Sequence, residues 1–119
     1  MDDKIAISFD SLIDMTGNNT ETLLPLLQVI IKGLKSYPQE IDAAFMDGNH
    51  KEVARLAHKY KSSIAYLECP QFIEVLSVLE NVANEGMSLE LVGKNVSQIE
   101  VYSEMVLEIT IDKVASLMQ

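Results

Sequence analysis

Apolar residues recur at three- and four-residue spacings along most of this 119-residue chain. This spacing places side chains on one face of an α-helix and predicts amphipathic helices. The apolar pattern is interrupted at Asp47-Gly48, at Cys69-Pro70 and at Gly86, where helices are expected to stop or start. We therefore expect one short helix and four long ones, over about residues 9–15, 20–47, 50–67, 70–85 and 88–118.

Two prolines interrupt the first long apolar pattern. A proline inside a helix removes one backbone hydrogen bond and clashes with the preceding turn. Pro25 therefore predicts either a local kink or a helix that begins close to it. Pro38 either starts a second helix or bends the first.

Amphipathic helices joined by short connections favour an all-α fold, and in particular an antiparallel four-helix bundle. The chain length suits one domain, which we place over residues 1–119. The short helix near residues 9–15 is expected to cap one end of the bundle. Residues 1–8 are polar and weakly patterned, so we expect a mobile lead-in there.

The charge balance is strongly acidic, with 18 Asp and Glu against nine Lys and Arg and a formal net charge of −9. Such a balance argues against a surface for nucleic acid or for an anionic membrane. Four of the nine basic residues nevertheless fall between residues 51 and 61. This local cluster indicates either a face for an anionic ligand or an acidic partner, or an ordinary solvated helix side.

Cys69 is the single cysteine, so no internal disulfide can form and a reducing compartment is expected. The first residues lack the cationic and apolar regions of a signal peptide. The longest apolar run, residues 23–31, is too short to span a bilayer. These features predict a cytoplasmic protein.

Several enzyme signatures are missing from the sequence. It has no glycine-rich phosphate loop, no HExxH motif and no CxxC motif. A di-iron bundle would need Glu-x-x-His pairs, and neither His50 nor His58 has a glutamate three residues earlier. We expect no cofactor of its own, no metal site and no catalytic role for His50, which we place in an exposed first helical turn.

Asn49 followed by Glu52 resembles a capping box and predicts that the helix carrying His58 begins near residue 50. Each helical residue advances about 100° around the axis. Opposite His58 this places an apolar stripe of Val53, Leu56, Tyr60, Ile64 and Leu67. Within about 60° of His58 it places Lys51, Arg55, Lys61 and Ser62. The helix should bury its aliphatic side and present His58 on a basic, solvated side, which suits a phosphoryl acceptor.

The stretch from His58 to Leu67 resembles the signature of histidine-containing phosphotransfer (HPt) domains. It contains His58-x-x-Lys61-Ser62-Ser63-x-Ala65-x-Leu67, where the family usually has His-x-x-Lys-Gly-Ser-x-x-x-Leu-Gly. Ser62 and Glu68 replace the two family glycines. Phe9-Asp10 with Thr16-Gly17, and the segment 44–48, are similar to two further family segments, so the resemblance covers about residues 9–117.

The resemblance implies an antiparallel four-helix bundle that acts as a phosphorelay carrier without turnover of its own. His58 would accept a phosphoryl group from an aspartyl phosphate of a receiver domain and pass it to another receiver. Lys61 would stabilise the charge of the transferred group. The residues expected to contact the partner are Lys51, Arg55, Lys59, Ser62 and Ala65. The partners would be receiver domains of a hybrid sensor kinase and of a downstream regulator, each supplying its own magnesium ion, and the carrier would be a monomer.

A second reading remains open at this point. Ser62 is bulkier than the glycine that the family usually has beside the histidine. If this bulk prevents phosphoryl transfer, the chain is a pseudo-carrier or adaptor bundle that binds receiver domains without accepting phosphate.

Overall fold

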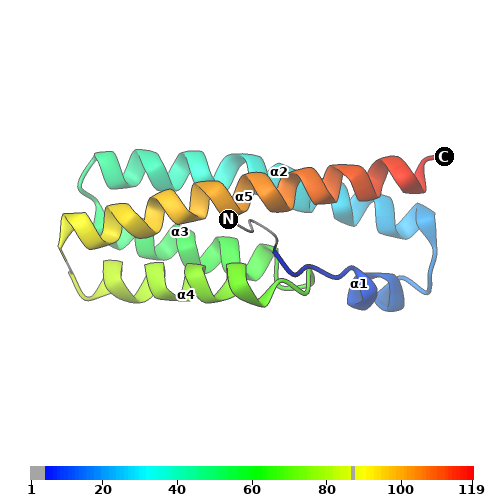
Figure 1. The fold of residues 1–119 in the computed structure, drawn as a ribbon, viewed down its shortest axis with the longest axis horizontal. Helices are drawn as coiled ribbons and strands as arrows, with labels where there is room; N and C mark the ends of the chain where they lie inside the picture. The colour runs from blue at the N-terminus through cyan, green and yellow to red at the C-terminus, as the bar shows by residue number, and fades with distance from the viewer. Residues whose placement is uncertain (1–4, 87) are drawn as a thin grey trace.

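The computed structural model describes residues 5–86 and 88–119, and these residues form an all-α structure (Figure 1). Its helices are α1 Asp10–Met15, α2 Thr20–Met46, α3 His50–Ser63, α4 Pro70–Asn84 and α5 Leu89–Leu117. The four long helices lie side by side along the longest axis of the molecule. α2 packs against α3 and α5, and α4 packs against the same two helices.

The apolar stripes of the helices meet in one core, as the spacing of the sequence predicts. Leu27 of α2, Val53 of α3, Leu76 of α4 and Ile99 of α5 are all fully buried. Each such side chain contributes about 1.5–3 kcal/mol by leaving water, so the packed stripes rather than local propensity hold the helices together. Leu12 of α1 joins the same core.

Tyr60 of α3 is the point where all four long helices meet. Its ring stacks on Tyr37 of α2 at a centroid distance of 5.0 Å and meets Phe72 of α4 edge-on at 5.3 Å. Its hydroxyl is 2.6 Å from the Ser103 hydroxyl of α5, so the buried oxygen is hydrogen-bonded. These contacts fix the rotation of α3 about its own axis. They thereby determine that His58, two residues earlier, points out of the core.

Side-chain caps start three of the long helices. The Asn49 side chain accepts from the Glu52 backbone N–H at 3.1 Å, which confirms the predicted start of α3. Asn19 accepts from Glu21 at 2.9 Å and Ser88 from Leu91 at 3.2 Å. Because each cap joins residues only two or three positions apart, such boundaries can be predicted from the local sequence.

The structure decides between the alternatives at the two prolines and corrects the expectation for His50. α2 is one helix that begins at Thr20 and contains both Pro25 and Pro38, so neither proline starts a helix. The Asn19 cap and the long buried stripe of α2 outweigh the loss of two backbone hydrogen bonds. His50 is half-buried rather than exposed, and its Nε2 is shielded from solvent with no hydrogen-bond partner among the described residues.

α3 ends at Ser63, four residues before the expected end at Leu67. The reason is a tertiary contact: the Ser8 and Glu68 backbones exchange two hydrogen bonds of 3.0 Å each. In a continued helix the Glu68 N–H would instead donate to the Ile64 carbonyl. Leu67 remains buried although it lies beyond the helix.

The same contact changes the description of the N-terminal segment. Residues 5–8, expected to belong to a mobile lead-in, lie against the bundle with Ile5 buried. The Ala6 N–H donates to the Gln71 side chain at 2.8 Å. The rest of the expected lead-in, residues 1–4, lies outside the described residues. None of the described helices is long and apolar enough to span a membrane.

Candidate functional site

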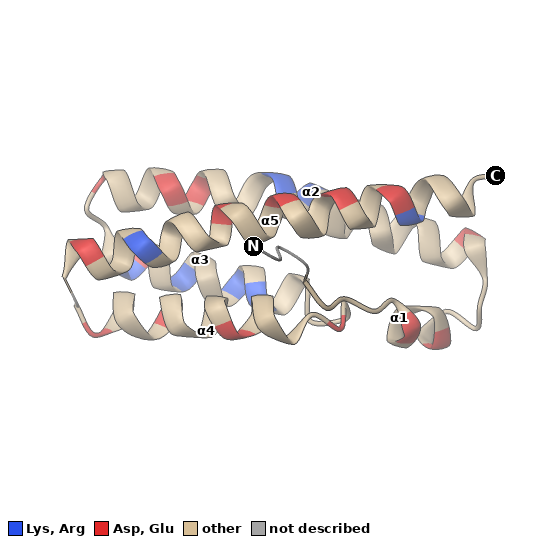
Figure 2. Cartoon of the chain, viewed as in Figure 1, with Lys and Arg blue, Asp and Glu red and all other residues tan. Residues whose placement is uncertain are grey.

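His58 lies in α3 with 61 % of its side chain exposed. The residues predicted to face the other way, Leu56, Tyr60, Ile64 and Leu67, are buried. The structure therefore confirms the two opposed faces of this segment. The basic residues of the chain also gather here, since the blue positions in Figure 2 follow one another along α3.

Glu80 of α4 joins two of the side chains on α3. Its Oε2 is 3.1 Å from Nδ1 of His58, and its Oε1 accepts a hydrogen bond from Nζ of Lys61 at 3.0 Å. Nζ of Lys61 also lies 3.3 Å from the Ser77 hydroxyl of α4. The bond from Lys61 is the main reason that the pKa of Glu80 is lowered, with His58 adding to the effect. Glu80 is therefore a carboxylate at neutral pH.

A charged carboxylate can only accept hydrogen bonds. When His58 is neutral, Nδ1 must therefore carry the ring proton and donate it to Glu80. The unprotonated nitrogen of the ring is then Nε2. Because the ring is largely exposed, a partner can approach this lone pair from solvent.

Arg55, one turn before His58, is paired within its own helix. Its guanidinium donates to both carboxylate oxygens of Glu52, at 2.7 and 2.6 Å. This bond lowers the pKa of Glu52 and raises that of Arg55. The pair is solvated, so its contribution to stability is small. Arg55 lies near His58 but its charge is offset.

A shallow hollow beside His58 brings together most of the predicted cations. It is lined by Lys51, Ala54, Arg55, His58, Lys59, Glu80 and Asn84. Lys61 is turned instead toward α4, where only 27 % of its side chain is exposed. Ser62 and Ala65 are exposed as predicted, and the Ser62 hydroxyl donates to the His58 carbonyl at 3.2 Å.

Glu80, Ser77 and Asn84 were missed by sequence reasoning. They recur at three- and four-residue spacing on α4 and so form a polar stripe on one side of that helix. The sequence pattern predicts this polar stripe. It does not predict that the stripe faces His58 and Lys61, because that depends on how α3 and α4 pack.

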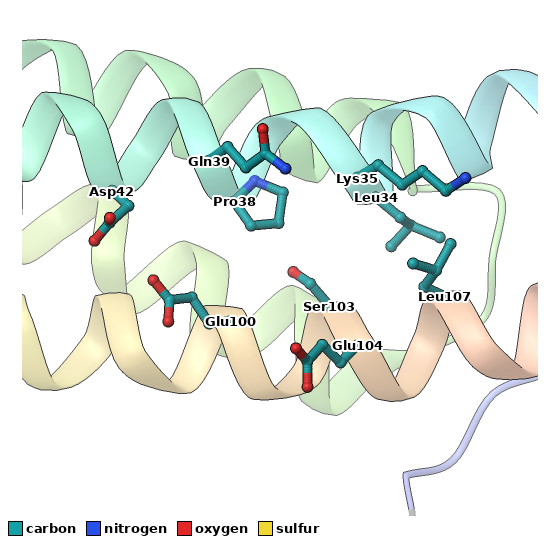
Figure 3. Close-up of a pocket in the computed structure, with 9 residues that line it drawn as sticks. All are labelled: Leu34, Lys35, Pro38, Gln39, Asp42, Glu100, Ser103, Glu104 and Leu107. Carbon is teal, nitrogen blue, oxygen red and sulfur yellow. The ribbon is translucent and has the colours of Figure 1, made fainter.

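A larger hollow lies between α2 and α5 and shares no lining residue with the His58 hollow (Figure 3). Its lining residues are Leu34, Lys35, Pro38, Gln39, Asp42, Glu100, Ser103, Glu104 and Leu107. It contains no histidine or cysteine, and thus no strong nucleophile. Cys69 is buried, and burial raises the pKa of its thiol to about 11, so it is not reactive at neutral pH. Among the described residues, no cluster of His, Cys, Asp and Glu could hold a metal ion.

The protein is an all-α domain with a solvent-facing imidazole on one helix. A carboxylate of the neighbouring helix contacts this imidazole and also accepts from a lysine. The family model for the Hpt domain matches residues 25–116 of the chain, which includes all of these residues. The chain therefore belongs to the Hpt domain family, whose members carry phosphoryl groups in two-component signalling and interact with receiver domains. No curated protein and no solved structure gives a significant match.

Proposed function

We propose that this domain is a phosphorelay carrier in which His58 accepts a phosphoryl group from one receiver domain and passes it to another. The observation that carries the proposal is the contact between Nδ1 of His58 and Glu80 on a largely exposed ring. This contact leaves the Nε2 lone pair unused, on a ring that is largely exposed to solvent. The family match supports the same reaction class.

In the accepting step, the Nε2 lone pair attacks phosphorus of the aspartyl phosphate in line with the leaving oxygen. The P–N bond forms as the P–O bond breaks, and the bonding electron pair leaves with the receiver's aspartate as a carboxylate. His58 retains its Nδ1 proton, so the ring becomes positively charged. Glu80 is in contact with the nitrogen that carries this proton.

Lys61 is the proposed stabiliser of charge on the transferred oxygens. Its ammonium group has three hydrogens, and Glu80 and Ser77 account for two of them. The third remains for a phosphoryl oxygen near His58. Glu80 and Ser77 also restrict the lysine to this region, so little conformational freedom is lost when the phosphoryl group arrives.

The proposed partner surface surrounds His58 on the exposed side of α3. Lys51, Arg55 and Lys59 would favour the approach of an acidic receiver surface, while Ser62 and Ala65 are small enough to permit close contact. The incoming and outgoing partners would be receivers of a hybrid sensor kinase and of a downstream regulator. Each would supply the magnesium ion that neutralises its own aspartyl phosphate.

We further infer the arrangement and setting of the domain. In Figure 1 the colour gradient runs in opposite directions along successive long helices, which supports an antiparallel four-helix bundle with α1 at one end. A monomeric carrier in the cytoplasm fits a single buried cysteine and an acidic surface.

The test is transfer of radioactive phosphate from a phosphorylated receiver domain to the wild type, to His58→Gln and to His50→Gln. We expect an acid-labile, base-stable label on the wild type and on His50→Gln, and none on His58→Gln. The two variants make the same chemical change at the chain's two histidines. Equal labelling of His58→Gln would refute the proposal. A wild type that binds the receiver without taking label would favour the pseudo-carrier, which Ser62 makes conceivable.

A further inference from the structure

Glu80 uses one oxygen for each of two side chains on α3. Oε2 faces Nδ1 of His58 at 3.1 Å while Oε1 accepts from Nζ of Lys61 at 3.0 Å. Only 22 % of the Glu80 side chain is exposed, so its position is set by protein contacts more than by solvent. The carboxylate cannot turn away from His58 without also straining its bond to Lys61.

We propose that Glu80 is a positioning residue that keeps a proton on Nδ1 of His58 after phosphorylation and so speeds the release of the phosphoryl group. This inference rests on the proposed function of His58. It concerns the outgoing step and assigns a role to a residue on a different helix from the histidine.

In the outgoing step, an oxygen of the acceptor attacks phosphorus, and a new P–O bond forms. The P–Nε2 bond breaks and its electron pair returns to Nε2. If Nδ1 still carries its proton, the histidine leaves as a neutral imidazole in its original tautomer. If that proton has been lost, the leaving group is an imidazolate anion, which is much less stable. Retention of the Nδ1 proton therefore controls how readily phosphorus is released.

Other charges near the ring oppose this retention. Lys51, Arg55 and Lys59 of α3 line the same hollow as His58, and positive charge favours loss of a ring proton. Arg55 is already paired with Glu52, and Lys51 and Lys59 are exposed to screening solvent. Glu80 is the acidic residue among the described residues lining the hollow, and it touches Nδ1 directly. A direct hydrogen bond to a carboxylate outweighs these screened charges.

The experiment compares the wild type with Glu80→Gln after both are phosphorylated with phosphoramidate and separated from this donor. Glutamine has nearly the same shape, and its single carbonyl oxygen can still accept from Nδ1. The change removes the negative charge and also the second acceptor oxygen, which Lys61 uses in the wild type. Glu74→Gln is the matched control, because it makes the same substitution at an exposed position of the same helix. Loss of the phosphohistidine signal to water is followed by phosphorus NMR between pH 5 and pH 9, and melting temperatures verify the fold.

At pH 8 we expect Glu80→Gln to lose its phosphoryl group about three- to tenfold more slowly than the wild type, the difference between a charged and a neutral acceptor. At pH 5 the two rates should agree, because both phosphorylated rings are then protonated. Glu74→Gln should match the wild type at every pH.

Equal rates for Glu80→Gln and the wild type at pH 8 would overturn the inference. A slowing of the same size at pH 5 and pH 8 would also overturn it, since that is the behaviour of a merely structural residue. A wild type that takes no phosphoryl group on His58 would overturn the proposed function and this inference together. If the wild type is phosphorylated on His58 and Glu80→Gln loses its phosphoryl group at the same rate, this inference is overturned and the carrier function stands.

Discussion

Two hollows of this domain, one between α3 and α4 and one between α2 and α5, differ in the charged residues that line them. The hollow between α3 and α4 holds three basic residues and one carboxylate around an exposed histidine. The hollow between α2 and α5 is larger, with three carboxylates and one lysine, and is lined by no histidine or cysteine (Figure 3). Judged by size alone, the hollow between α2 and α5 would be the candidate site. The residues favour the hollow between α3 and α4, because phosphoryl transfer needs a nucleophile and positive charge close together.

The largest expected effect concerns access to the α3–α4 face. Ser62→Leu should block phosphoryl transfer, because a bulky side chain one turn after His58 hinders the approach of a receiver. Ser62→Gly is its matched opposite and should be neutral or faster. Both are measured as the initial rate of label transfer from a phosphorylated receiver. Unimpaired transfer by Ser62→Leu would show that receivers do not approach over this residue.

The next prediction compares the same substitution, lysine to alanine, at the His58 site and in the α2–α5 hollow. Lys61→Ala should slow transfer by about ten- to a thousandfold, as expected if the lysine supplies about 1.4–4 kcal/mol of charge stabilisation. Lys35→Ala, in the α2–α5 hollow, should leave the rate unchanged. The measurement is the single-turnover rate of transfer. Equal rates for the two variants would remove the distinction between the hollows.

A third prediction sets the core against the site. Leu76→Ala should lower the free energy of unfolding by about 2–5 kcal/mol, because Leu76 is fully buried and its truncation leaves a cavity. His58→Gln should leave the free energy of unfolding within about 0.5 kcal/mol of the wild type, as for most exposed positions. Denaturant titration of both variants checks this. Equal losses from both would contradict the assigned faces of the helices.

The smallest effect is expected in the acidic hollow. Glu104→Gln removes one of its charges at an exposed position and should change neither transfer nor stability measurably. Transfer assays at low and high salt check this, because low salt exaggerates surface electrostatics. A rate change at low salt would show that receivers sense the charge of the α2–α5 face.

Local patterns predicted much of the fold. The buried stripe of α3 and the cap at Asn49 follow from residues within one or two turns, and the structure confirms them. The early end of α3 could not be predicted, because it depends on a contact between Ser8 and Glu68, sixty residues apart. Pro38 was ambiguous for the same reason, since packing against the rest of the bundle decides whether a helix continues through a proline.

The candidate site divides in the same way. His58, Lys61 and their place on the same side of the helix follow from helical spacing and from a short motif. Glu80 lies 22 residues beyond His58, on the neighbouring helix, and no local pattern pairs it with that ring. The choice of Nε2 as the reactive nitrogen depends on Glu80. The sequence alone could therefore indicate the residue but not the atom.

Nitrogen-15 and phosphorus NMR of the histidine-labelled, phosphorylated domain would test the central claim most directly. The scalar coupling between phosphorus and nitrogen identifies the bonded atom, and His50→Gln assigns the residue. We predict a single coupling to Nε2 of His58, with the proton resonance remaining on Nδ1. A coupling to Nδ1 of His58, to either nitrogen of His50, or to no nitrogen at all would contradict the account.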